Sequence, residues 1–188
     1  MNLMSKTLDI PWEKYSIIAN LSKQLEAISP LFGRTVLQKM IYILQEVFEI
    51  PCGYEYSFYN YGPYSSELAS DLEYVEFLGG VNVTWLENIG GYHITPGAKC
   101  DRIISKASPF LDANNQKISQ CIEEFGSSNA GKLELIATII YVDRYSKKNR
   151  LRLGSKDLSK KVKELKPKFS ESDIEETAKT LSRKKYIH

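Results

Sequence analysis

The stretch that decides the fold reads GRTVLQKMIYILQEVF (33–48), followed by YEYSFYNYGPYSSELASDLEYVEFLGG (54–80). Its first part repeats apolar residues at the spacing of one helix face, which predicts a helix over residues 35–48. In this helix we expect buried Leu37, Met40, Ile41, Leu44 and Phe48, and outward-facing Gln38, Lys39, Gln45 and Glu46.

The second part of the stretch changes to a strand pattern. Residues 54–59 alternate in the manner of a strand. Gly62-Pro63 then predicts a turn, after which Ser65 or Ser66 can cap a helix by accepting a hydrogen bond from a free backbone amide. That helix would bury Leu68, Leu72 and Val75.

The segments on either side complete a recognisable order of elements. An amphipathic helix is predicted over residues 14–28, ended by Ser29-Pro30. Its buried face would hold Ile17, Ile18, Leu21, Leu25 and Ile28. Downstream, residues 81–86 and 92–94 predict a hairpin, and Thr95-Pro96 predicts the start of another helix. Three helices and then a two-stranded ribbon are the order of a winged helix. We therefore predict an α+β, mainly helical fold whose residues 1–110 form a winged-helix-like domain.

The remaining residues, 111–188, predict a helical domain. Helical patterns cover 115–125, 133–142 and 155–165, with Ser155 as a possible cap, and residues 126–131 form a flexible joint. The run Ser170 to Asp173 resembles a capping box before a last helix. The order of helix, short helix, turn and helix is that of a second helix-turn-helix.

The residues 33–42 (GRTVLQKMIY), followed by Tyr61-Gly62-Pro63-Tyr64-Ser65 and an acidic helix, resemble the YwgA-like proteins. This is a largely uncharacterised prokaryotic family for which a regulatory role in transcription is suggested. More distantly, Leu37-Gln38-Lys39 with Tyr61-Gly62-Pro63 is similar to the core pattern of the Panacea antitoxin domain. The resemblance covers about residues 14–95. It implies a non-enzymatic regulator or a neutralising partner of another protein, and it supplies no catalytic residues.

Charge is divided unevenly along the chain. Residues 1–100 hold 6 Lys and Arg against 11 Asp and Glu, a net −5, and residues 101–188 hold 19 against 12, a net +7. Such asymmetry favours a polyanionic partner, although a solvated helix face would look the same. The residues we expect to contact nucleic acid are Arg144, Lys147, Lys148, Arg150, Arg152, Lys156, Lys160, Lys161, Lys163 and Lys168.

The first half is a poor candidate for reading DNA. Its third helix, over residues 65–78, has four acidic residues and no Lys or Arg, so its field would repel phosphates. An acidic helix beside exposed tyrosines suits a protein partner or a homodimer. The candidate partner-binding residues are Tyr59, Tyr61, Tyr64, Glu67 and Asp71, whereas Tyr54 and Tyr56 are expected in the core. The run Tyr61 to Tyr64 is either a structural turn or a binding lip.

Little in the sequence points to catalysis. Cys52, Cys100 and Cys121 are spaced unlike a metal framework and are interpreted as buried thiols. Two histidines, His93 and His188, are too isolated for a zinc site. We therefore expect no enzyme activity, no metal and no cofactor. No apolar run reaches the roughly 20 residues of a membrane span, and no signal peptide is evident, so a cytoplasmic location is expected.

Two functions stay open from the sequence. The leading hypothesis is a winged-helix-type regulator that binds DNA through its basic C-terminal half. The alternative is an antitoxin-like module that binds a protein partner without nucleic acid.

Overall fold

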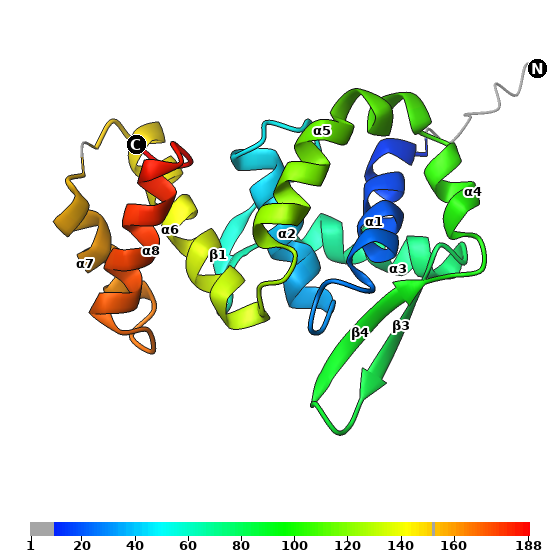
Figure 1. Ribbon diagram of the computed structural model, residues 1–188, viewed down its shortest axis with the longest axis horizontal. Helices are drawn as coiled ribbons and strands as arrows, with labels where there is room; N and C mark the ends of the chain where they lie inside the picture. Colours follow the sequence, from blue (N-terminus) through cyan, green and yellow to red (C-terminus); the bar gives the residue numbers. More distant parts are fainter. Residues whose placement is uncertain (1–9, 152) are drawn as a thin grey trace, which may run out of the picture.

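The computed structural model describes residues 10–151 and 153–188 and shows an α+β, mainly helical fold (Figure 1). The described helices are α1 (Trp12–Leu25), α2 (Arg34–Glu46), α3 (Ser66–Phe77), α4 (Cys100–Ser105), α5 (Ser108–Phe125), α6 (Ala130–Lys148), α7 (Ser155–Leu165) and α8 (Glu171–Arg183). The strands are β1 (Ser57–Tyr59), β2 (Gly62–Tyr64), β3 (Val81–Leu86) and β4 (Gly91–Pro96), and they form two antiparallel hairpins. The mainly helical α+β class is thus confirmed.

Helices α1 and α2 form the centre of the first half. Their predicted apolar stripes are buried, with the exception of Ile28, which lies beyond the end of α1 and is 46% exposed. The prediction for Ile28 was wrong because α1 ends at Leu25, before the Ser29-Pro30 signal.

The strand and turn of the 54–64 region lie differently from the prediction. β1 pairs with β2 so that Phe58 is opposite Pro63 and Tyr59 is opposite Gly62, which leaves Asn60 and Tyr61 as the loop. Gly62-Pro63 is therefore part of a strand, and the predicted turn falls one step earlier. Gly62 has a φ of 86°, and a Cβ there would lie 3.0 Å from Thr138 Oγ1, so this position needs glycine.

The β1–β2 hairpin covers one side of α2, and it overturns the prediction that Gln38 and Lys39 face outward. Both are buried. The Gln38 side chain donates to Ser65 O at 2.8 Å and accepts from Ser65 N at 2.9 Å, and Lys39 Nζ donates to Pro63 O at 2.7 Å. Two polar residues on the helix thus satisfy backbone groups of the hairpin, a role that helical periodicity alone cannot reveal.

Capping of α3 is confirmed, and the predicted helix start at Thr95-Pro96 is wrong. Ser65 is the N-cap of α3 and accepts from Leu68 N. Thr95 and Pro96 belong to β4, where they pair with Asn82 and Val81 of β3. Pro96 lacks an N–H, but at the last position of a hairpin strand this loss is tolerated. The β3–β4 hairpin projects from the helical body (Figure 1).

Helix α6 joins the two halves. It packs against α2 and β2 on one side and against α7 and α8 on the other, and its 133–142 run is buried as predicted, except for half-buried Tyr141. The core of the described residues is one cluster that draws on both halves. The predicted division between residues 110 and 111 falls inside α5.

The C-terminal helices follow the predicted order with two corrections. Gly154, not Ser155, is the N-cap of α7, and Leu165, which the helical pattern over residues 155–165 predicts to face inward, is 43% exposed. Ser170 caps α8 as predicted: its Oγ accepts from Asp173 N at 3.0 Å and lies 2.6 Å from Asp173 Oδ2. All three cysteines are buried free thiols, as expected.

Candidate nucleic-acid interface

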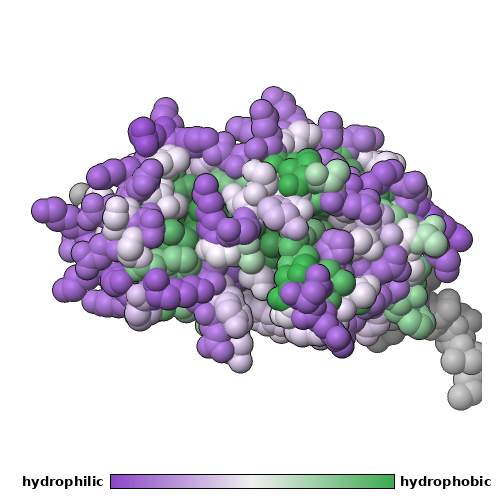
Figure 2. Space-filling model, turned by 60° about the horizontal axis from the view of Figure 1, so that its bottom comes forward, coloured by the Kyte–Doolittle hydropathy of each residue, from purple (hydrophilic) through white to green (hydrophobic). Residues whose placement is uncertain are grey.

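The basic segment from Arg144 to Lys168 covers the end of α6, the link to α7, α7 itself and the turn before α8. In Figure 2 the end of the molecule formed by α7 and α8 shows mainly hydrophilic side chains. Helix α7 is strongly two-sided, because Leu158 and Val162 are buried while Lys156 and Lys160, four residues apart, are exposed on the other side. This arrangement presents a row of cations to solvent.

Five of the ten predicted contact residues are exposed cations without an ion pair inside the described structure. We call them the basic face: Lys148, Arg150, Lys156, Lys160 and Lys161. Two of them belong to the end of α6 and its link, and three belong to α7. Each of the five could contact a phosphate without losing a contact inside the protein.

Four other predicted residues already have partners within the protein. Arg144 Nη2 donates to Glu46 O at 2.8 Å and to Tyr186 O at 3.0 Å, and its Nη1 lies 2.5 Å from Asp143 Oδ2. It is half-buried and braces the end of α2 against the C-terminal residues. We therefore interpret Arg144 as a structural residue.

The remaining partnered residues are lysines. Lys163 Nζ donates to Pro167 O at 2.9 Å and to Phe169 O at 2.7 Å, which closes the α7–α8 turn. Lys168 Nζ lies 2.7 Å from Glu134 Oε2, and Lys147 Nζ lies 2.7 Å from His188 Nε2. Arg152 lies outside the described residues.

The position of α8 restricts how DNA could be read. In a helix-turn-helix, the N-terminal residues of the second helix contact base edges. The start of α8 exposes Glu171, Asp173, Glu175 and Glu176, which would face phosphates and bases with the wrong charge. Contact through the basic face of α7 is therefore favoured over base reading by α8.

The predicted protein-binding residues are only partly together on the surface. Tyr59 and Tyr61 are 62% and 61% exposed, and the Tyr59 and Tyr64 rings lie 5.9 Å apart. Glu67 is exposed but pairs with Lys14 at 2.5 Å. Asp71 is buried and accepts from Tyr54 Oη at 3.0 Å, and burial raises its pKa despite this hydrogen bond. Asp71 is thus a core residue, contrary to the prediction, because the α3 face it occupies packs inward.

The three tyrosines surround a pocket that the sequence did not reveal. It has a volume of about 230 Å³ and lies between α2, the β1–β2 hairpin and α3. Leu37, Leu68 and Leu72 supply its apolar walls, and Arg34 lies at its edge. Sequence reasoning could not find the pocket, because its walls meet only when the hairpin folds over α2.

A buried charge cluster was also missed. Glu134 on α6 is 3% exposed and lies 2.9 Å from Lys166 Nζ and 2.7 Å from Lys168 Nζ. Lys166 also donates to Asn60 O, and Lys39 is held nearby on Pro63 O. Burial raises the pKa of Glu134, but the hydrogen bond from Lys168 and the nearby ammonium of Lys166 outweigh it and leave that pKa lowered. The one available signal was a carboxylate within an otherwise apolar run.

Over residues 10–151 and 153–188, no helix combines the length and the apolar character that crossing a bilayer requires. Within the same ranges, no three His, Cys, Asp or Glu residues form a group able to hold a metal ion.

Comparison with known proteins shows that the chain is similar to a bacterial protein over most of its length. No family model matches the chain. The chain is 30% identical over 176 residues to the uncharacterised protein YwgA of Bacillus subtilis (strain 168), an alignment that spans 90% of this chain and 96% of the relative.

Proposed function

The chain belongs to the YwgA family, and for this member we propose a non-enzymatic regulator that binds DNA through the basic face of its C-terminal half. The observation that carries the proposal is the set of exposed, unpaired cations on α7 and at the end of α6. Phosphate contacts from such residues supply affinity and little base specificity.

The order of the helices and of the β3–β4 hairpin supports a regulator of the winged-helix type. Helices α1, α2 and α3 are followed by the β3–β4 hairpin in the position of a wing, and α6, α7 and α8 repeat a three-helix order. On this proposal DNA contacts belong to residues 111–188, which share one core with the first half. The acidic surface of α3 keeps the first half away from the phosphates.

The test is fluorescence anisotropy with a random duplex and a single strand over a salt series. Five phosphate contacts predict a log–log salt slope of about −4 to −5 for the duplex. The combined substitution Lys156→Gln, Lys160→Gln and Lys161→Gln should weaken binding at low salt by at least about tenfold and flatten the slope by about 3.

A matched control separates local contacts from net charge. Arg102, Lys117 and Lys132 are also exposed, and replacing all three by Gln changes the net charge by the same amount. This control should retain the affinity and slope of the wild type. Equal losses in both triple variants, or no binding to duplex DNA at low salt, would overturn the proposal.

A second candidate function rests on the tyrosine-lined pocket. Three exposed tyrosines around a small apolar pocket are suited to anchor one apolar side chain of a protein partner. On this reading the protein is an antitoxin-like module, and a second copy of the chain is one possible partner. Light scattering of the wild type and of a Tyr59→Ala, Tyr61→Ala variant tests the homodimer. A dimer lost in the variant, together with no DNA binding, would favour this function.

A further inference from the structure

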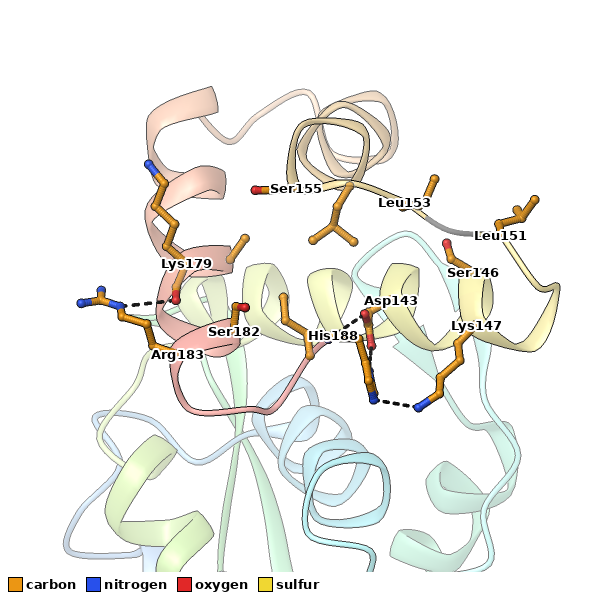
Figure 3. Close-up of a pocket in the computed structure, with 13 residues that line it drawn as sticks. Asp143, Ser146, Lys147, Leu151, Leu153, Ser155, Lys179, Ser182, Arg183 and His188 are labelled. Atoms are coloured by element: carbon orange, nitrogen blue, oxygen red, sulfur yellow. Dashed lines mark hydrogen bonds and ion pairs between the residues drawn. The ribbon is translucent and has the colours of Figure 1, made fainter.

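A second, larger cavity lies in the C-terminal half, on the opposite side of α7 from Lys156 and Lys160. It has a volume of about 810 Å³ and is enclosed by the end of α6, the link to α7, α7, and the end of α8 with the residues after it (Figure 3). We call it the C-terminal groove. Its size is that of pockets which accept small organic molecules.

The floor of the groove is apolar. Leu158, Ala178 and Ile187 line it and are each no more than 6% exposed. Leu151 and Leu153 extend this surface at the rim. No Phe, Tyr or Trp side chain is among its described lining residues, so the groove lacks the large rings on which nucleic-acid bases usually stack. Its floor suits a hydrocarbon or ring body.

The rim of the groove is cationic. Lys179 and Arg183 lie one turn apart on α8 and both line the groove. Figure 3 shows their side chains extending outward from α8, where Arg183 makes long hydrogen bonds of 3.4 Å to Lys179 O and Thr180 Oγ1. Lys179 lies 3.9 Å from Glu175, an exposed and weak pairing. Lys147 stands on the α6 side. Three cations from two helices therefore border an apolar floor.

The one side-chain carboxylate among the described lining residues does not cancel this charge. Asp143 is held by Arg144 at 2.5 Å and by the His188 backbone N–H at 3.1 Å. His188 Nδ1 lies 3.2 Å from the same carboxylate, and Lys147 donates to His188 Nε2. A donor at Nε2 makes that nitrogen an acceptor, so the proton lies on Nδ1 and points to Asp143. Asp143 is thus engaged, and the field at the rim stays positive.

A buried hydroxyl adds a polar group inside the groove. Ser146 is 4% exposed, lines the groove, and its Oγ has no hydrogen-bond partner within the described part of the chain. An unpaired buried hydroxyl costs free energy, which a ligand or a water molecule with a polar atom could recover. The groove therefore holds a free polar group on its α6 side, near Lys147 (Figure 3).

We propose that the C-terminal groove binds a small amphipathic organic anion, with a carboxylate, sulfonate or phosphate head at Lys179 and Arg183 and an apolar body on Leu158, Ala178 and Ile187. The site is distinct from the basic face, since the two share no residue and Lys156 and Lys160 lie on the opposite side of α7 from Leu158. It is therefore independent of DNA binding, and either can fail without the other.

Isothermal titration calorimetry with three probes tests the site. Decanoate and 8-anilino-1-naphthalenesulfonate are amphipathic anions with aliphatic and aromatic bodies, and decyltrimethylammonium carries a similar chain with a positive head. Saturable one-to-one binding of at least one anion, and none of the cation, is expected.

Variants place the binding in the groove. Lys179→Gln with Arg183→Gln should weaken anion binding about tenfold, because two charge-assisted contacts are lost at a partly solvated rim. Ser182→Trp, at an exposed lining residue, should abolish binding by filling the groove. Arg102→Gln with Lys117→Gln removes the same charge elsewhere and should have no effect.

Several results would overturn the proposal. These are no saturable binding of either anion, equal binding of the cation, or anion affinity that survives both sets of groove substitutions. Displacement of the bound anion by a single-stranded oligonucleotide would assign the groove to nucleic acid instead. Should Ser182→Trp fail to fold by circular dichroism, the Lys179 and Arg183 variant, at two exposed positions, still decides the question.

Discussion

Lys39 shows how one side chain can have a different role from the one its helix position suggests. Its ammonium is 2% exposed and donates to Pro63 O, which fixes the β1–β2 hairpin on α2. Burial lowers its pKa to about 8 from an ordinary 10.5, nearby Glu134 opposes this shift, and Lys166 adds to it. The charged form is thus costly in the folded protein, and the hydrogen bond to the hairpin is retained despite this cost.

The lowered pKa predicts a pH dependence of stability. Between pH 8 and 10.5 the unfolded chain holds a proton on Lys39 that the folded chain has released, so the free energy of unfolding rises with pH. The slope is at most about 1.4 kcal/mol per pH unit. Lys39→Met removes this titration. The free energy of unfolding of the wild type, relative to that of the variant, should therefore rise by about 2 kcal/mol between pH 8 and 10.

Urea unfolding of both proteins at intervals of half a pH unit measures this difference. Lys117→Met, at an exposed lysine of α5, is the control and should keep a constant difference from the wild type. A constant difference for Lys39→Met as well would mean that the Lys39 amine is not shifted by burial.

At the scale of elements, Glu134 connects parts that are far apart in the sequence. It belongs to α6, it pairs with Lys166 and Lys168 of the α7–α8 turn, and Lys166 also holds the β1–β2 loop at Asn60. One carboxylate therefore ties the hairpin of the first half to the turn of the second.

Replacing Glu134 by Gln should destabilise the protein by about 3 kcal/mol at pH 7, because the buried Lys166 loses its counter-charge. The pKa of Glu134 is lowered in the folded state, so its contribution is complete above its ordinary pKa of 4.5 and is lost as the pH falls below it. The two proteins should accordingly converge in stability at acid pH. Hydrogen exchange of residues 57–64 should also become faster in the variant at neutral pH.

Glu123→Gln, at an exposed carboxylate of α5, is the matched control and should change stability by less than about 0.5 kcal/mol. Slower or unchanged hydrogen exchange of the β1–β2 hairpin in Glu134→Gln would show that the ion pairs of Glu134 do not hold this hairpin in place.

The same elements explain which sequence predictions succeeded. Local signals were enough for the stripes of α2 and α6, for the Ser65 and Ser170 caps and for the β3–β4 hairpin. They failed where a distant segment decides the outcome. The sequence predicts Arg144 as a DNA contact, but in the folded protein the backbone oxygen of Glu46, 98 residues away, accepts its hydrogen bonds. Lys168 is likewise predicted as a DNA contact, but it pairs with Glu134. No periodicity reports such partners, so about half of the predicted interface remained as free cations.

At the scale of the whole molecule, the two halves share their core. Phe48 of the first half lies 6.4 Å from Phe125 of α5 and 5.6 Å from Tyr186 near the C-terminus, measured between ring centroids. Helix α6 packs on α2 along the same junction. A hydrophobic junction of this kind couples the unfolding of the parts it joins.

We therefore expect the chain to unfold in urea as one cooperative unit. Both tryptophans, Trp12 and Trp85, are in the first half, so their fluorescence reports that half, whereas far-ultraviolet circular dichroism reports all the helices. The two signals should give one midpoint. Tyr186→Ala should lower the free energy of unfolding by about 2 kcal/mol by both signals, although residue 186 is in the second half. Tyr145→Ala, at a 52% exposed tyrosine, should change the free energy of unfolding by no more than about 0.5 kcal/mol by either signal. Separate midpoints, or a Tyr186→Ala effect on circular dichroism alone, would mean that residues 1–110 and 111–188 fold as independent domains and that the shared aromatic junction contributes little.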